Sequence, residues 1–103
     1  MTQLTSQEVQ QKIENKESFV LDLFATWCGP CKVLIGNLNA LEKSEENLPL
    51  GIYSMDIDTD RDFVMNLGIR SVPTLKVYKE GEEVFSNVGV MSQSQLLEVM
   101  NKY

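Results

Sequence analysis

Two cysteines are the residues of this chain with the clearest chemical potential. Cys28 and Cys31 are its only cysteines, and they stand as a C-x-x-C motif within Trp27-Cys-Gly-Pro-Cys31. Residues three apart lie on one face of a helix, so the two sulfurs can form a disulfide without unwinding it. Such a pair between a strand and a helix indicates a redox-active site in an intracellular protein. The alternative is a fixed disulfide or two inert thiols, although lasting disulfides are rare in the cytosol.

The start of the helix gives the two cysteines different expected roles. Cys28, at the entrance, faces unpaired backbone N–H groups and the positive end of the helix dipole, which favour a thiolate. We therefore expect Cys28 to be the nucleophile. Cys31 lies one turn inside and is shielded, which fits the resolving cysteine. In the expected reaction Cys28 attacks a substrate disulfide, and Cys31 then attacks Cys28 and frees the reduced substrate.

Composition excludes several other functions. The chain has no histidine, which excludes Ser-His and Cys-His catalysis. Two cysteines supply at most half of a structural zinc site, so we expect no metal. The net charge of −6 argues against binding nucleic acid. No apolar stretch reaches the roughly 20 residues that a membrane helix needs, and the polar start Met1–Ser6 does not resemble a secretory signal, so we expect a cytoplasmic protein with no membrane role.

One acidic residue interrupts an apolar run. Asp22 lies within Phe19–Ala25, a run typical of a central strand covered on both faces. A buried carboxylate is costly, so its proton is held more tightly than in water and the group could act as a base. A structural aspartate with a satisfying hydrogen bond is the alternative. The residues alone leave both interpretations open.

The elements that would position these residues form a single α/β domain. A length of 103 residues fits one domain, residues 1–103. Capping boxes at Thr5 and Ser92 mark two helix starts. The expected elements are helix 6–15, strand 19–25, helix 30–44, strand 52–57, a short helix that starts with Thr59-x-x-Asp62 and ends at Gly68, strands 74–78 and 83–88 in a hairpin, and a final helix after Ser92, with a short strand before Thr5 also considered. This order predicts parallel strands joined by right-handed crossovers, with an antiparallel strand at the edge.

Three motifs in this order resemble the thioredoxin family. The segment from Phe19 to Lys32 is similar to the thioredoxin active-site segment, and Gly68-Ile-Arg-Ser-Val-Pro-Thr74 is similar to the family's cis-proline loop. Gly89 falls where thioredoxins keep a glycine beside the site. The likeness covers nearly the whole chain. It implies the thioredoxin fold, a central mixed sheet of four to five strands flanked by four helices.

The resemblance also assigns site residues. Asp22 resembles the thioredoxin aspartate that helps to deprotonate the resolving cysteine. A cis bond at Pro73 would hold the backbone of Val72 beside the cysteines, with its N–H and C=O free to pair with an extended substrate. The implied docking surface consists of Trp27, Gly29, Pro30, Ile69, Val72, Pro73, Gly89 and Val90. For Ile69 and Val90, core packing remains an alternative.

The implied function is a general protein-disulfide reductase and electron carrier. The resemblance implies electrons from a thioredoxin reductase, disulfide-containing client proteins, a monomer, and no cofactor beyond the redox-active disulfide Cys28–Cys31. Gly29 and Pro30 between the cysteines resemble reducing members of the superfamily. An oxidase or isomerase of the same fold is one alternative. A binding module or subunit whose redox chemistry is incidental is another.

Two positions depart from the family pattern. Ser54 stands where many thioredoxins have a buried lysine near the aspartate, which puts the pH dependence of Asp22 in doubt. Gly36 replaces the proline that normally kinks the long helix, so we expect that helix to run straighter.

Overall fold

Four helices begin at side chains that cap them. The computed structural model describes residues 1–103. Both predicted capping boxes are present, Thr5 before α1 (Ser6–Glu14) and Ser92 before α4 (Gln93–Lys102). Cys28 caps α2 (Gly29–Ser44), which runs unbroken through Gly36. Most predicted bounds differ from the observed ones by a single residue.

The short helix α3 (Arg61–Asn66) starts later than predicted. Its cap is Asp60, whose carboxylate accepts from the Phe63 N–H, and not Thr59. The Thr59 hydroxyl instead donates to the Asp56 carbonyl at 2.7 Å, within a 3-10 turn, η1 (Ile57–Thr59), that the sequence analysis did not predict. The predicted end at Gly68 is confirmed. Gly68 has a φ of +77° there, a conformation that glycine adopts without a steric penalty.

The sheet is mixed, with strand order β1-β3-β2-β4-β5. The strands are β1 (Thr2–Gln3), β2 (Phe19–Phe24), β3 (Gly51–Asp56), β4 (Thr74–Lys79) and β5 (Glu82–Val88). β1, β3 and β2 are parallel, and the short first strand that we considered is present.

The expectation of an antiparallel strand only at the edge was wrong. β4 lies inside the sheet and pairs antiparallel with both β2 and β5. The connection from β3 to β4 explains this direction. Its helix α3 has six residues and spans about 9 Å, whereas a six-residue strand spans about 20 Å, so this connection does not carry the chain back along the sheet. β4 therefore starts at the same end of the sheet at which β3 stops, and it runs in the opposite direction.

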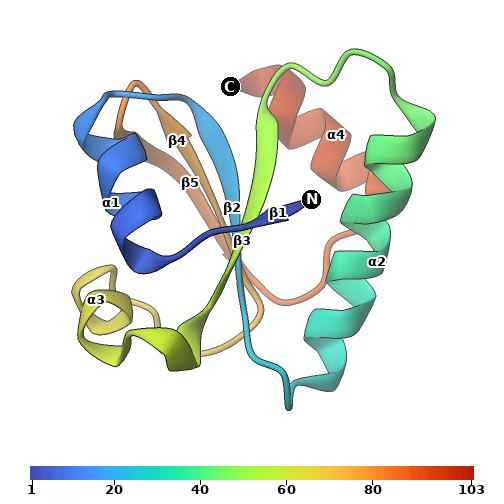
Figure 1. Ribbon diagram of the computed structural model, residues 1–103. Coiled ribbons are helices and arrows are strands. Elements are labelled where there is room, and N and C mark those ends of the chain that lie inside the picture. The colour runs from blue at the N-terminus through green and yellow to red at the C-terminus, as the bar shows by residue number, and fades with distance from the viewer.

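Helices cover both faces of the sheet. Figure 1 shows α1 and α3 on one side and α2 and α4 on the other. Alternate residues of β2 enter two separate cores, Val20 with the leucines of α2 and Leu21 with Val9 of α1. The predicted helical spacing is confirmed, since Leu34, Leu38 and Leu41 of α2 are all buried. Both faces of the sheet are thus packed against helices.

The predicted hairpin joins β4 to β5. Glu80 and Gly81 both have positive φ, 53° and 81°, which matches a type I′ turn. A Cβ on Gly81 would lie 2.6 Å from the Ile13 carbonyl oxygen, so the close approach to α1 requires glycine. The pairing contains a β-bulge at Val77–Tyr78, where Val84 is the extra residue of β5.

Candidate active site

The two cysteines lie where β2 feeds α2, and they are joined as a disulfide. After β2 the chain turns back, with the Cys28 N–H donating to the Ala25 carbonyl at 3.2 Å. Pro30 then occupies the first turn of α2, where its missing N–H leaves no hydrogen bond unmade. Cys28 is 5 % exposed and Cys31 1 %, so the first sulfur is the more accessible.

The helix start directs a donor at Cys28. The Cys31 N–H donates to the Cys28 sulfur at 3.2 Å, which makes Cys28 the cap of α2. The first N–H groups of a helix have no partner within the helix, and the dipole is positive at this end. Negative charge on the Cys28 sulfur is therefore stabilised by this geometry, as the sequence analysis expected.

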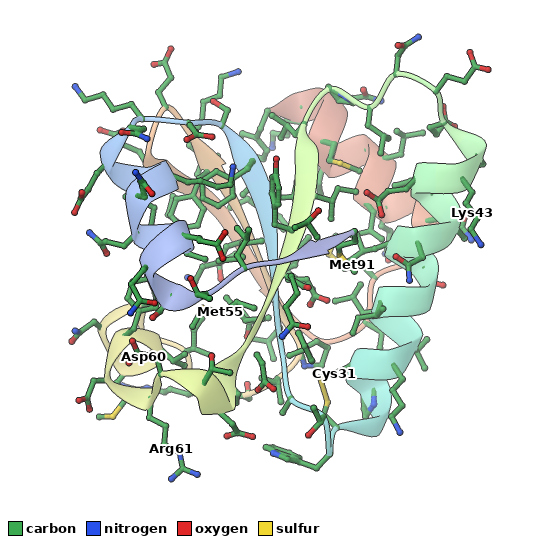
Figure 2. All side chains as sticks on the ribbon, viewed as in Figure 1. Cys31, Lys43, Met55, Asp60, Arg61 and Met91 are labelled. Carbon is green, nitrogen blue, oxygen red and sulfur yellow. A yellow bond between two sulfur atoms is a disulfide. The ribbon has the colours of Figure 1, made fainter.

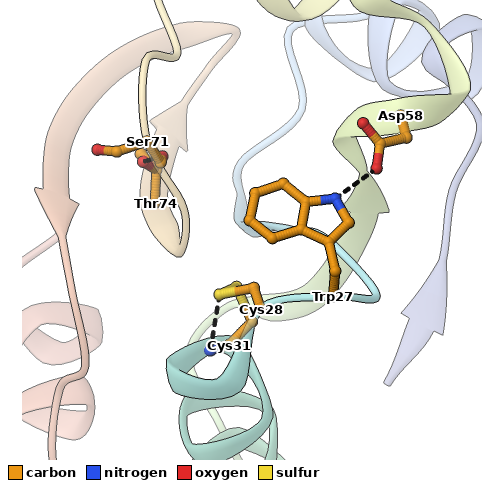
Figure 3. The surroundings of a disulfide bond; sticks show 6 residues. All are labelled: Trp27, Cys28, Cys31, Asp58, Ser71 and Thr74. Atoms are coloured by element: carbon orange, nitrogen blue, oxygen red, sulfur yellow. Dashed lines mark hydrogen bonds between the residues drawn. A yellow bond between two sulfur atoms is a disulfide. The ribbon is translucent and has the colours of Figure 1, made fainter.

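Trp27 projects from the site and is held by a residue that the sequence analysis missed. Its side chain is 70 % exposed, yet its indole Nε1 donates to the Asp58 carboxylate at 2.9 Å. The Asp58 backbone N–H in turn donates to the Asp56 carboxylate at 2.9 Å. Figure 3 shows the indole between Asp58 and the Ser71–Thr74 loop, next to the disulfide. The topology offered a signal for this contact. β2 and β3 are parallel neighbours, so a residue that follows β3, such as Asp58, lies near a residue that follows β2, such as Trp27.

The loop before β4 packs against the disulfide and carries free backbone groups. The Val72–Pro73 peptide is cis, as the resemblance implied. Val72 packs against the cluster of Ala25, Cys28 and Cys31. Its N–H and C=O make no hydrogen bond within the protein. The loop itself is fixed by the Thr74 hydroxyl, which donates to the Ser71 carbonyl at 2.7 Å.

The remaining docking residues fall into two groups. The Gly89 N–H donates to the Pro73 carbonyl at 2.9 Å, and Val90 beside it is 44 % exposed. Gly29 and Pro30 are also exposed. Ile69 differs, because it is half-buried and packs against the core on the α1 side. Core packing, the alternative for Ile69, therefore describes at least part of its side chain.

Asp22 is completely buried in the middle of the sheet. No protein group hydrogen-bonds to either of its carboxylate oxygens, contrary to the alternative of a structurally satisfied aspartate. Burial raises the pKa of Asp22 from its usual 3.8 to about 7. Its neighbours in register are Ser54 on β3 and Leu75 on β4, and neither supplies a counter-charge.

The surface around the disulfide is shallow. Five hollows of about 280 to 480 Å³ lie elsewhere on the molecule, and neither cysteine lines any of them. The largest, about 480 Å³, lies between β5 and α4 and includes Val88, Val90 and Tyr103 among its lining residues. A flat surface with free backbone groups suits a polypeptide better than an enclosed small molecule.

Two further findings concern metals and membranes. No three His, Cys, Asp or Glu side chains converge into a group that could hold a metal ion. None of the helices combines the length and apolar character needed to span a bilayer.

Comparisons with known proteins agree on one family. The thioredoxin family model matches residues 1–102. The thioredoxin of Listeria monocytogenes is 38 % identical over 91 residues, covering 87 % of each chain. The thioredoxin of Porphyra purpurea is 32 % identical over 104 residues, covering 100 % of this chain and 96 % of its own. Among solved structures, Fasciola hepatica thioredoxin has a TM-score of 0.82 at 26 % identity, covering 99 % of this chain and 98 % of that one.

Proposed function

The chain belongs to the thioredoxin family, a family of protein-disulfide oxidoreductases, and we propose that it is a general reductase in which Cys28 attacks and Cys31 resolves. The observation that carries this assignment is the cap of α2. The Cys31 N–H points at the Cys28 sulfur from 3.2 Å, so the first sulfur of the motif is the one whose thiolate the helix stabilises.

The first step joins the client to Cys28 through a mixed disulfide. The Cys28 thiolate attacks one sulfur of the client disulfide, a Cys28–client bond forms, and the client S–S bond breaks. The client's second sulfur leaves as a thiolate and takes a proton from water. Cys28 is more exposed than Cys31, which supports its role as the attacking sulfur.

The second step frees the reduced client. Asp22 accepts the proton of the Cys31 thiol, and the Cys31 sulfur then attacks Cys28 and expels the client thiolate. The product is the Cys28–Cys31 disulfide, and the client has gained two electrons. A base works best when its pKa lies near the working pH, and a pKa of about 7 for Asp22 supports this role.

Clients dock as extended segments across the shallow surface. The free N–H and C=O of Val72 pair with the client backbone, next to the disulfide that the client segment must reach. Apolar contacts come from the exposed side chains around it. The docking set is Trp27, Gly29, Pro30, Ile69, Val72, Pro73, Gly89 and Val90.

The family generally works with a thioredoxin reductase and with disulfide-containing clients. We assign the same electron source to this chain, which makes it an electron carrier with no cofactor other than its own disulfide. We further propose that it acts in the cytoplasm as a monomer of one domain, residues 1–103. The net charge of −6 supports a protein that stays apart from nucleic acids and from copies of itself.

Insulin reduction tests the proposal, with dithiothreitol as the electron source. The wild type should turn over, and both Cys28→Ser and Cys31→Ser should abolish catalysis. Only Cys31→Ser should accumulate a mixed disulfide with insulin, because it keeps the attacking sulfur and lacks the resolving one. A trapped adduct in Cys28→Ser instead would reverse the assigned roles. A folded wild type without activity would favour a binding module. A separate measurement of the reduction potential of the Cys28–Cys31 disulfide distinguishes the other alternative, since a strongly oxidising value would favour an oxidase or isomerase.

A further inference from the structure

Asn37 connects the catalytic helix to the segment Gly89–Met91. Its side-chain amide donates to the Met91 carbonyl at 2.9 Å, and this carbonyl has no other hydrogen-bond partner. Figure 2 shows Met91 beside α2, between the positions of Cys31 and Lys43. Met91 is itself buried in the core. One half-buried amide on α2 therefore holds the end of a segment that lies 54 residues away in the sequence.

The same segment is bound to the proline loop at its other end. The Gly89 N–H donates to the Pro73 carbonyl at 2.9 Å. Two hydrogen bonds in series thus join α2, the segment Gly89–Met91 and the Val72–Pro73 loop. Gly89 has a φ of +103°, and a residue without a side chain restricts the backbone least. Val90 lies between the two bonds, and its side chain is 44 % exposed.

We propose that Asn37 is a positioning residue for client docking, which sets the affinity for protein disulfides and takes no part in sulfur exchange. This inference rests on the proposed function, in which Gly89 and Val90 contact the client. Holding the segment in place before the client arrives removes an ordering penalty from binding. Loss of one ordinary hydrogen bond should weaken docking about fivefold.

The test compares Asn37→Asp with Asn39→Asp. The first change keeps the side-chain shape but replaces the NH₂ donor with an oxygen that cannot donate to the Met91 carbonyl. Asn39 is a matched control because it lies on α2, is exposed and makes no side-chain hydrogen bond, while the charge change is the same. The reactions are insulin reduction and reduction of dithiobis-nitrobenzoate, a small disulfide that does not need the docking segment.

Asn37→Asp should raise the KM for insulin about fivefold, while kcat and the rate with dithiobis-nitrobenzoate stay within about twofold of wild type. Asn39→Asp should match wild type in all three. Hydrogen exchange of the Gly89 amide should quicken in Asn37→Asp, and that of the Val9 amide in α1 should not.

An unchanged KM, an equal loss with both disulfides, or unaltered exchange at Gly89 would overturn the proposal. An equal loss with both disulfides would mean that Asn37 acts through overall stability. Unaltered exchange at Gly89 would mean that Asn37 does not hold the segment Gly89–Met91. A wild type that reduces the small disulfide but not insulin would instead contradict the proposed function. The wild-type assay alone gives that result, so failure of the proposed function is distinguished from failure of the Asn37 proposal.

Discussion

Two charged residues are buried in neighbouring strands of the sheet, and only one of them has polar partners. Lys76 on β4 is 4 % exposed, and its ammonium pairs with Glu83 and lies 3.5 Å from the Ser86 hydroxyl, both on β5. Asp22 on β2 is 0 % exposed, and neither carboxylate oxygen has a partner. Lys76 is opposite Leu21 in register, so it lies on the α1 side of the sheet, whereas Asp22 faces α2.

The position of each strand explains the difference. Lys76 lies next to the edge strand, so its aliphatic stem packs inside while its charge reaches Glu83, whose side chain is 43 % exposed. Asp22 lies on β2, between β3 and β4, where no neighbour supplies a partner. A buried charge that is paired is compatible with a purely structural role. A buried carboxyl that is unpaired lowers stability, and such local violations are expected mainly where a site needs them.

Removing the Asp22 carboxyl should give the largest effect on stability. The folded-state pKa of about 7 lies above the usual 3.8, so the folded protein binds the proton more tightly than the unfolded chain. Wild type should therefore lose stability as the pH rises from about 4 to about 7, by roughly 4 kcal/mol in total. Asn cannot titrate, so the advantage of Asp22→Asn should grow from near zero at pH 4 to that amount at pH 8.

Urea unfolding of the two oxidised proteins across this pH range measures the difference. Curves that stay parallel from pH 4 to pH 8 would show that Asp22 ionises normally in the folded protein, and the comparison with Lys76 would then fail.

The same substitution should slow the second chemical step. Without a base for the Cys31 thiol, decay of the Cys28–client disulfide should slow about a hundredfold at pH 7. The gap should narrow above pH 8.5, where a thiol of ordinary pKa ionises unaided. Rapid-quench trapping of the mixed disulfide measures this decay, and formation of the adduct serves as the internal control. Equal slowing of formation and decay would mean that Asp22 acts on Cys28 or on the fold.

Local patterns predicted most helix starts and the position of the cysteine pair well. Capping boxes at Thr5 and Ser92 involve residues three apart, and both are present. The C-x-x-C motif is equally local, and it placed Cys28 at the entrance of α2, where the structure has it as the cap. The positive-φ pair Glu80–Gly81 is a further local signal that the structure confirms. In each case the interacting groups are close in sequence, so the physics is visible in the residue order.

Contacts between distant segments were not predictable in the same way. Thr59 and Asp60 are both good helix caps, and the observed cap, Asp60, also accepts a hydrogen bond from the Ser6 hydroxyl across 54 residues. The direction of β4 depends on where the chain re-enters the sheet, which residue types do not specify. Asp58 reaches Trp27 across 31 residues, and Asn37 reaches Met91 across 54. Asp22 was predictable as buried, but its lack of a partner follows only from register with Ser54 and Leu75.

A partner for Asp22 would make it resemble Lys76. Ser54→Lys places an ammonium on the residue opposite Asp22 in β3, and an opposite charge nearby should lower the pKa of Asp22 by at least about one unit. The fall in stability with pH should then occur at lower pH. Carboxyl titration followed by infrared difference spectroscopy measures the shift. Ser54→Met is the control, since it adds similar bulk without charge, and an equal shift in both variants would exclude the ion pair as the cause.

Loss of the Lys76 charge should have the smallest effect. Lys76→Met keeps most of the buried stem, and Glu83 is exposed enough to be hydrated alone, so the free energy of unfolding should change by less than about 1 kcal/mol. Insulin reduction and the titration of Asp22 should not change, because the two residues lie on opposite faces of the sheet. A loss above about 3 kcal/mol in urea unfolding would show that the Lys76–Glu83 pair is essential to the fold.

The bulge in β5 affects whether folded molecules associate through their sheet edges at high concentration. A free sheet edge exposes unpaired N–H and C=O groups that can template intermolecular sheets and aggregation. One edge here is β1, which has only two residues. The other is β5, where the extra residue Val84 breaks the ladder directly after the acidic pair Glu82–Glu83. Shortness at one edge, and irregularity with like charge at the other, leave no long regular strand on which a second molecule could extend the sheet.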